Sequence, residues 1–543
     1  MLTPCPWALG RGAMDPSLPL RQLWTGDGLH ACHRMTKRPR HLLVARGGLP
    51  GHSTQVPLPR APVSDQHPQH RRAHGRARLG SPLSTQEWAG TWVADRLGLA
   101  LSTGPSATGL QLAELVGLAV RRNPRRAHLL VSTVLGKHLP TDPTLVHGAG
   151  RLLGVLVAQA LTGAHPSDRV GGALLSSALA GSRRASRSLL ARCLHHCTPP
   201  LPNGTLVLGY AETATGLGHC VAAQLGAPVL HSTRRRVPGV PGAPGFEEEH
   251  SHATSHLLLP GDPDLLRGPG PLVLVDDELS TGATAANTII ALHAAYPRAR
   301  YIIAALVDLR SEGDRTALAD LEARLQIRID VVALTTGSVH LPEGVLAAGA
   351  QLADGIQPLT ATTTDGGQCA LLLHRSGWPT TVPEGGRHGI TAQQGRQLAA
   401  AAAALARDLA IALPDNDRVH ILGFEELMYA PLLIADTLAE RLAATVTYST
   451  TTRSPVLVVP EVGYAITSGI TFGAHDHPDD GPGARYAYNI PPGATVVVVL
   501  DEHANTAQLY APDGLLAQLT GIAPHVALVT LPSHQPCTDR DDL

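Results

Sequence analysis

The sequence predicts an α/β protein built on parallel β-sheets with helices on both faces. Short aliphatic runs alternate with longer helix-forming segments along most of the chain. Aliphatic side chains must build the core, because hydrophobic residues make up 43% of the sequence and aromatic residues only 3%. Short apolar strands separated by helices are typical of a doubly wound parallel sheet rather than of a β-sandwich.

Two α/β domains are expected, because 543 residues exceed what a single hydrophobic core usually covers. We place the first domain at residues 85–340 and the second at 365–535, with a linker near 360–367. Residues 1–80 are rich in Pro, Gly, Arg and His without sustained periodicity, which predicts disorder. A functional basic arm and a true start codon at Met14 or Met35 are the alternatives for this segment.

Charge and cysteine content exclude several classes of protein. Residues 1–80 hold 12 Lys or Arg and three Asp, so the remainder is acidic and nucleic-acid binding is not expected of it. Seven scattered cysteines fit a reducing cytoplasm better than a disulfide framework. Cys193, His195, His196 and Cys197 lie too close along one helix to converge on zinc. Because no signal peptide or membrane-length apolar stretch is recognisable, we expect a cytoplasmic protein without a membrane partner.

The first domain has the pattern of successive strand–helix units. A helical pattern runs through 110–120, and a strand is expected at 128–132. Further strands are expected at 205–208, 228–231, 272–275, 301–307 and 329–334, with helices ending at 225, beginning at 283 and covering 316–325. In the second domain, the Ala-rich run 398–413 predicts a packed helix.

A faint internal repeat links the two domains. Three short landmarks recur in the same order and at similar spacing, which predicts two copies of one fold. The pairs are Leu208-Gly-Tyr-Ala-Glu212 with Leu422-Gly-Phe-Glu-Glu426, His231-Ser-Thr-Arg234 with Ser449-Thr-Thr-Thr-Arg453, and Val275-Asp-Asp277 with Leu500-Asp-Glu502.

The strongest chemical signal is residues 272–284, four aliphatic residues and two carboxylates followed by Glu-Leu-Ser-Thr-Gly-Ala-Thr. The strand is expected to end at Val275, which places Asp276 and Asp277 at the ligand-binding edge of a parallel sheet. Adjacent carboxylates can accept hydrogen bonds from the vicinal hydroxyls of a ribose. Residues 280–284 then turn into a helix and offer N–H groups and hydroxyls to a phosphate. A capped strand–helix turn alone would explain the Thr and Gly residues but not the paired carboxylates.

This segment resembles the phosphoribosyl pyrophosphate (PRPP) motif of type I phosphoribosyltransferases, and the order of parts around it resembles orotate phosphoribosyltransferase. More closely, residues 85–535 resemble the two-part phosphoribosyltransferase–TRSP proteins of bacterial tellurium-resistance gene neighbourhoods. Their second part is named for a Thr-Arg-Ser-Pro tetrapeptide, here Thr452-Arg-Ser-Pro455. Val131-Ser-Thr-Val-Leu-Gly-Lys-His-Leu-Pro140 and Glu212-Thr-Ala-Thr-Gly-Leu-Gly218 resemble the same family. The resemblance implies a type I phosphoribosyltransferase-like sheet followed by a degenerate α/β copy, the TRSP domain.

The resemblance also implies a set of PRPP-binding residues. Residues 212–218 take the place of the pyrophosphate loop, and small side chains, hydroxyls and a helix start suit that role. The arginines after the 228–231 strand take the place where related enzymes hold basic residues against pyrophosphate. The family's Lys is absent there, and a solvated charge run is the alternative. The implied PRPP-binding residues are Glu212, Thr213, Ala214, Thr215, Gly216, Arg234, Arg235, Asp276, Asp277, Ser280, Thr281, Gly282, Ala283 and Thr284.

Residues 242–256 take the place of the mobile flap that closes over the substrate and excludes water. His250 and His252 are acid/base candidates on this flap. A plain surface loop and a transition-metal site formed by His250, His252 and His256 are the alternatives.

The acceptor side and the second domain offer weaker candidates. Lys137 and His138 lie where type I enzymes build the hood that selects the acceptor, although a solvated pair is equally open. In the second domain Thr281-Gly-Ala-Thr284 is replaced by Thr506-Ala-Gln-Leu509, so the phosphate turn is lost. Pocket candidates there, against a purely structural role, are Glu425, Glu426, Tyr429, Thr452, Arg453, Ser454 and Asp501.

These features predict a PRPP-dependent phosphoribosyltransferase that passes ribose 5-phosphate to a nitrogen acceptor, a base or an amine, and releases pyrophosphate. The catalytic candidates are Asp276, Asp277, His250 and His252, with Mg²⁺ held through PRPP near the aspartates rather than by a motif of its own. A non-catalytic PRPP-sensing regulator and a scaffold of two degenerate halves are the alternatives. The expected partners are PRPP and a small-molecule acceptor, and a homodimer is left open.

Overall fold

A computed structural model describes residues 87–536, apart from 124–125, 165–170, 197–199, 236, 238–239, 241, 248–254, 357–369, 376 and 477–482. All described residues belong to one compact unit. The basic N-terminal segment, the expected linker, the flap histidines His250 and His252, and Cys197 lie outside the described residues. Residues 87–356 are the first half of the structure and residues 370–536 the second half.

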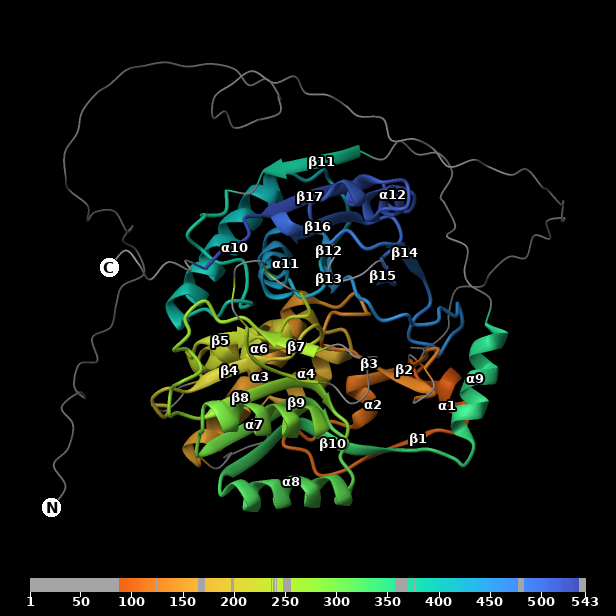
Figure 1. The fold of residues 1–543 in the computed structure, drawn as a ribbon. Helices are drawn as coiled ribbons and strands as arrows, with labels where there is room; N and C mark the ends of the chain where they lie inside the picture. Colours follow the sequence, from red (N-terminus) through yellow and green to blue (C-terminus); the bar gives the residue numbers. More distant parts are fainter. Residues whose placement is uncertain are drawn as a thin grey trace, which may run out of the picture. The chain divides into compact units, whose positions relative to one another are not determined.

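The first half is built on a six-stranded sheet flanked by helices (Figure 1). The strand order is β1-β10-β9-β8-β4-β5, and β1 alone pairs antiparallel to its neighbour. Aliphatic side chains along β8 and β9 are buried on both faces, which is typical of parallel strands covered by helices. The strands are β1 Ala100–Thr103, β4 Leu206–Gly209, β5 Val229–His231, β8 Leu272–Leu279, β9 Arg300–Asp308 and β10 Arg328–His340.

Four helices cover this sheet: α3 Pro143–Thr162, α6 Thr215–Leu225, α7 Ala283–Ala295 and α8 Glu312–Leu325. Helices α3 and α6 pack closely, and the absence of a side chain on Gly150 allows this approach. A Cβ on Gly150 would lie only 2.5 Å from the Cβ of Cys220. Among the described residues, α3 alone has the length and hydropathy of a membrane-crossing helix, and 83% of its apolar window is buried inside the fold.

Smaller elements complete the first half. Strands β2 and β3 form a two-stranded antiparallel sheet, and β6 and β7 form a hairpin between β5 and β8. The bounds are α1 Thr91–Leu97, α2 Leu112–Leu115, β2 Val116–Val120, β3 His128–Ser132, α4 Gly172–Leu179, α5 Arg183–Leu194, β6 Ala243–Glu247, β7 Ser255–Leu258 and α9 Val345–Gly355.

The second half is built on a five-stranded, fully parallel sheet in the order β11-β17-β16-β12-β13. A hairpin of β14 and β15 lies between β13 and β16 in the chain. The predicted α/β class with a second α/β region is therefore confirmed. The elements are β11 Ala370–Arg375, α10 Ala392–Ala412, β12 Arg418–Gly423, α11 Tyr429–Arg441, β13 Thr445–Thr450, β14 Gly469–Gly473, β15 Ala484–Tyr488, β16 Thr495–Asp501, α12 Leu515–Thr520 and β17 His525–Leu531.

The two sheets repeat one arrangement. The order β9-β8-β4-β5 in the first sheet corresponds to β17-β16-β12-β13 in the second. The three landmark pairs of the internal repeat lie at or near the carboxyl ends of β4 and β12, β5 and β13, and β8 and β16. Helix α11 of the second half packs against α3 and α6 of the first, and one apolar core contains residues of both halves.

Two sequence-based predictions about elements were wrong. The helix predicted over 110–120 is instead the short helix α2 followed by strand β2, whose five residues are all buried. A short apolar run buried on every side does not reveal its period, so such a strand resembles a helix in the sequence. The strand predicted to end at Val275 continues to Leu279, because β9 offers backbone partners as far as Asp308.

Candidate functional site

The paired carboxylates lie toward the carboxyl end of β8, in the middle of the first sheet. Asp276 and Asp277 are partly exposed, and the Asp277 N–H donates a hydrogen bond to Asp276 Oδ1 at 2.9 Å. The next residue, Glu278, forms an ion pair with Arg126 at 3.1 Å. The two aspartates are therefore accessible to a ligand at the sheet edge.

The predicted phosphate turn, residues 280–284, leads from β8 into α7. Gly282 has φ of +85°, a backbone conformation that residues with a Cβ rarely adopt. The hydroxyl of Thr281 accepts a hydrogen bond from the Ala283 N–H at 3.2 Å. The remaining N–H groups of the first turn of α7, a helix of 13 residues, present positive charge beside the aspartates.

The loop 212–216 connects β4 to α6 and is buried under the second half. Glu212 and Thr215 are 5% and 1% exposed. The hydroxyl of Thr215 donates a hydrogen bond to the backbone carbonyl of Glu426 at 2.9 Å. A Cβ on Gly216 would lie 3.0 Å from the Cβ of Met428. The implied pyrophosphate loop is thus held in place by residues of the other half.

The two acceptor candidates occupy different environments. Lys137 Nζ donates a hydrogen bond to Thr213 Oγ1 at 2.6 Å and lies 3.8 Å from Glu212 Oε1. This lysine therefore contacts the loop 212–216 directly. His138 is buried, and its ring centroid lies 5.8 Å from that of Tyr488. Burial lowers the pKa of His138 well below its usual range, and the positive charge of Lys137 lowers it further.

The loop after β5 also meets the second half. The hydroxyl of Thr233 lies 2.8 Å and 3.0 Å from the two carboxylate oxygens of Glu426 and donates to them. The Arg234 N–H donates to the same carboxylate at 2.9 Å. In the opposite direction, the Arg453 N–H donates to Glu212 at 3.4 Å. Glu426 therefore contacts both first-half loops that the family resemblance associates with pyrophosphate.

A buried cluster of four guanidinium groups and four carboxylates surrounds these contacts. Arg235 lies 3.8 Å from Glu425, 3.7 Å from Asp476 and 3.5 Å from Asp501. Arg235, which the resemblance assigns to pyrophosphate, therefore pairs with carboxylates of the second half. The members are Arg235, Arg387, Arg453, Arg485, Glu425, Glu426, Asp476 and Asp501, and no side chain among them is more than 19% exposed.

The cluster is held together by its charges. Burial raises the pKa of Glu426, but Arg387 and Arg235 outweigh it and lower the pKa to about 2. The same two arginines overcome the effect of burial on Asp501, so its pKa is lowered as well. Both carboxylates are ionised at neutral pH, and their negative charges make burial of Arg235 and Arg387 tolerable.

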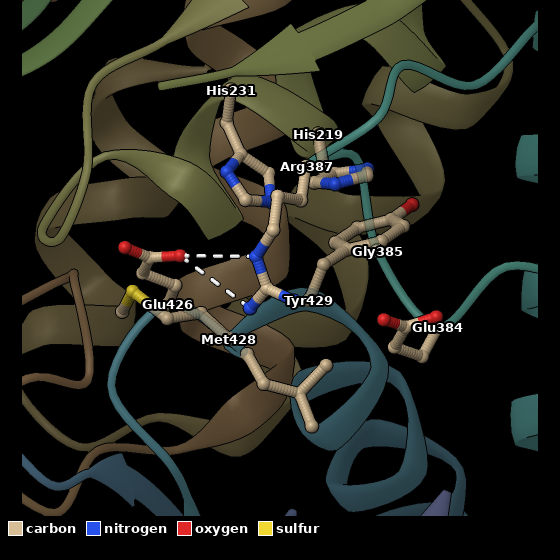
Figure 2. A pocket seen from close by; sticks show the side chains of 9 residues that line it. His219, His231, Glu384, Gly385, Arg387, Glu426, Met428 and Tyr429 are labelled. Carbon is tan, nitrogen blue, oxygen red and sulfur yellow. Dashed lines mark hydrogen bonds and ion pairs between the residues drawn. The ribbon is translucent and has the colours of Figure 1, made fainter. Parts of the chain in front are cut away.

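A small pocket beside the cluster is formed by both halves (Figure 2). The ring of His219 stacks on that of Tyr429 at a centroid distance of 4.7 Å. Burial lowers the pKa of His219 to about 3 and that of His231 to about 4, so both rings are neutral at physiological pH. The lining residues are His219, His231, Glu384, Gly385, Arg387, Glu426, Leu427, Met428 and Tyr429.

The predicted flap is described only at its base. Strands β6 and β7 pair there, and the tip with His250 and His252 falls outside the described residues. His256 is fully buried, its Nδ1 lies 2.8 Å from Ser232 Oγ, and its ring packs against Tyr210. Within the described ranges, no group of three His, Cys, Asp or Glu side chains is arranged to hold a metal ion.

The counterpart of the phosphate turn in the second half has a different structure. Asp501 ends β16 as its place in the repeat predicts, but it is only 2% exposed and paired with arginines. Where α7 begins in the first half, the second half has two 3₁₀ turns, Glu502–Ala504 and Ala507–Tyr510. The buried side chain of Leu509 stands in place of the final hydroxyl.

Two family models match the chain. Residues 115–338 match the phosphoribosyl transferase family, and residues 384–519 match the TRSP domain that lies C-terminal to this transferase. Together the matches cover more than half of the 543 residues. The chain belongs to the phosphoribosyltransferase–TRSP family. The first half of the structure thus carries the transferase domain of the family, and the second half carries the TRSP domain.

Solved structures similar to this family member include adenine phosphoribosyltransferases. The enzyme from Trypanosoma brucei, in complex with AMP, pyrophosphate and ribose-5-phosphate, is 15% identical with a TM-score of 0.19, over 24% of this chain and 56% of that one. The Giardia lamblia enzyme is 19% identical with a TM-score of 0.21, over 29% and 84% of the two chains. The Leishmania tarentolae enzyme is 18% identical with a TM-score of 0.21, over 32% and 78%. The chain spans just over half the length of the trypanosomal enzyme, and similarity this low carries no information about substrates. No curated protein matches the sequence.

Several site residues of this phosphoribosyltransferase–TRSP protein carried no sequence signal. Arg387, Asp476 and Arg485 belong to no motif of the repeat, and only the tertiary structure brings them to Glu425 and Glu426. Thr233 lies inside the second landmark of the repeat, His231-Ser-Thr-Arg234, so the repeat offered a signal by which it could have been chosen as a site residue. The contact of Lys137 with the loop 212–216 is likewise a long-range one.

The buried neutral histidines are expected to lower stability in acid, while burial raises the pKa of Glu384 to about 7, which acts in the opposite direction. Burial lowers the pKa of His219 to about 3, of His231 to about 4 and of His420 to about 3. The unfolded chain binds these protons below a pH of about 6.5, whereas the folded protein does not, so the histidine contribution to stability falls as pH decreases from there toward 4. Denaturant titrations between pH 7 and pH 4.5 should show this contribution as a difference in slope, because His420→Gln loses less stability on acidification than the unmodified chain. Equal slopes for the two proteins would contradict the prediction.

Proposed function

We propose that this chain is a PRPP-dependent phosphoribosyltransferase that transfers ribose 5-phosphate to a nitrogen acceptor and releases pyrophosphate. One observation carries the proposal. Two accessible carboxylates near the end of the central strand β8 lie beside the Gly282 turn that opens α7, within a domain of the phosphoribosyl transferase family. Ligands of open α/β sheets bind at this edge.

The residues at the edge have complementary tasks in the proposed reaction. Asp276 and Asp277 accept hydrogen bonds from the ribose hydroxyls, and residues 280–284 bind the 5′-phosphate through N–H groups and hydroxyls. We assign the pyrophosphate side of the site to the loop 212–216. Lys137, in contact with that loop, supplies positive charge where negative charge develops.

Mg²⁺ fits the chemistry of this site. Asp276 and Asp277 supply hard, partly exposed oxygen donors, and Mg²⁺ commonly takes its remaining ligands from water and substrate phosphates. When bound, the ion would neutralise charge on the pyrophosphate group. The protein's own residues hold the ribose and its phosphate in line with the acceptor, which converts a bimolecular collision into an oriented encounter.

The transfer exchanges one bond at the anomeric carbon. Its bond to the pyrophosphate oxygen breaks while a bond to the acceptor nitrogen forms, and the nitrogen gives up a proton. A base or another amine can serve as the acceptor. We assign the acid/base and water-excluding roles to the flap, with His250 and His252 as its reactive groups.

Calorimetric titration with PRPP, in the presence and absence of Mg²⁺, tests the proposal. We expect one PRPP site per chain and tighter binding with Mg²⁺. A panel of nucleobases and amines should then contain at least one acceptor that gives pyrophosphate release. Binding without turnover for any acceptor would favour a PRPP-sensing regulator, and absence of binding would reject the proposal.

A further inference from the structure

The two halves contact each other through matched pairs of contacts. Thr141, just before α3, forms an antiparallel bridge with Tyr448 of β13. In the opposite direction Ile390, just before α10, forms an antiparallel bridge with Val229 of β5. In both cases the residue that precedes the N-cap of a helix pairs with a strand of the other half.

The loops at the sheet edges repeat this reciprocity. The Arg234 N–H donates to Glu426, and the Arg453 N–H donates to Glu212. The internal repeat matches Arg234 with Arg453 and Glu212 with Glu426. If a residue of the first half contacts a residue of the second, the equivalent residues of the two halves contact each other in the reverse direction. Such reciprocal contacts are typical of a two-fold interface between identical subunits. The second half therefore stands where the partner of a two-fold dimer would stand.

Several of the contacts between the two halves involve one residue, Glu426. Glu426 is 4% exposed and accepts from the Thr233 hydroxyl and the Arg234 N–H. Its carbonyl accepts from the hydroxyl of Thr215, where the loop 212–216 becomes α6. One second-half residue thus contacts two separate loops of the first half, and its ionised carboxylate makes the hydrogen bonds from Thr233 and Arg234 charge-assisted.

We propose that the second half completes the phosphoribosyl site of the first, and that Glu426 is the positioning residue for its pyrophosphate side. This inference rests on the proposed function. Loops of small residues hold a polyanion only when their N–H groups and hydroxyls are fixed beforehand, and Glu426 supplies that fixation. Among the described residues, the ribose 5-phosphate side, formed by β8 and the start of α7, makes no hydrogen bond or ion pair with Glu426.

Asp501 provides a matched control for Glu426. Both are buried carboxylates of the second half, and both interact electrostatically with Arg387 and Arg235. Asp501 accepts a backbone hydrogen bond from Ala504 of its own half, whereas Glu426 accepts from Thr233 and Arg234 of the first half. Removing either charge perturbs the cluster and its arginines, but only the change at Glu426 weakens the hydrogen bonds from Thr233 and the Arg234 N–H.

The test is calorimetric binding of inorganic pyrophosphate and of ribose 5-phosphate, each with Mg²⁺, to the full chain. Glu426→Gln should weaken pyrophosphate binding by about tenfold or more, while ribose 5-phosphate affinity changes by less than about twofold. Asp501→Asn should change neither affinity by more than about twofold. Equal pyrophosphate affinity in the two variants, or an equal loss of both ligands in Glu426→Gln, would overturn the inference.

Thr233→Val provides a second route, because it removes the donor on the first-half side and leaves the cluster's charges intact. It should weaken pyrophosphate binding in the same direction, and the double variant with Glu426→Gln should be no weaker than Glu426→Gln alone. Additive losses would show that the two residues act separately and would count against the inference. If the unmodified chain binds neither pyrophosphate, ribose 5-phosphate nor PRPP, the proposed function itself fails, which is a distinct result.

Discussion

Asp277→Asn is expected to weaken PRPP binding by about tenfold to a hundredfold, because hydrogen bonds to a charged carboxylate are worth roughly 1.5–3 kcal/mol each. Asp277 is partly exposed near the end of β8, so the change removes a ligand contact without emptying the core. Titration calorimetry with PRPP and Mg²⁺ measures the loss, and far-ultraviolet circular dichroism verifies that the fold is retained.

Asp330→Asn is the control for this measurement. Asp330 lies near the start of β10, at the opposite edge of the same sheet, and pairs with Arg300 and Arg328. This variant should bind PRPP as the unmodified chain does. Unchanged affinity in Asp277→Asn would remove the basis for placing the ribose at this edge.

Arg235→Met is expected to destabilise the protein by about 3–5 kcal/mol, because it removes one of the four buried cations that balance the carboxylates of the cluster. Arg235 is 5% exposed and lies within 4 Å of Glu425, Asp476 and Asp501. The Met side chain approximates the volume of the arginine stem, so the loss is one of charge and hydrogen bonding rather than packing. Equilibrium denaturation at neutral pH measures the effect.

A surface arginine is the comparison for that variant. Arg328 pairs with Asp330 at 2.8 Å, but its side chain is 62% exposed. Arg328→Met should therefore leave the unfolding midpoint nearly unchanged, since solvent screens exposed ion pairs. A loss in Arg235→Met no larger than in Arg328→Met would show that the buried cluster does not stabilise the junction of the two halves.

Local patterns in the sequence predicted the parts of this protein that depend on neighbouring residues. The strand expected at 128–132 is β3, and the turn at Gly282 opens α7 as its residue types indicate. The landmark pairs of the repeat lie at the ends of matching strands in the two sheets. The prediction of a helix over 110–120 was wrong because β2 is buried on all sides, and such a strand shows no alternation of apolar and polar residues.

The amino-acid sequence by itself determined the α/β class, the duplicated fold and the carboxylates beside the phosphate turn, because each depends on residue types a few positions apart. Only the tertiary structure decided that Glu426 contacts Thr233, that Lys137 reaches Thr213 and that Arg235 pairs with Asp501. These contacts join segments from different parts of the chain, and no local pattern records them. These contacts depend on the packing of the whole fold, because a buried charge is tolerated only where packing brings it to a partner of opposite charge.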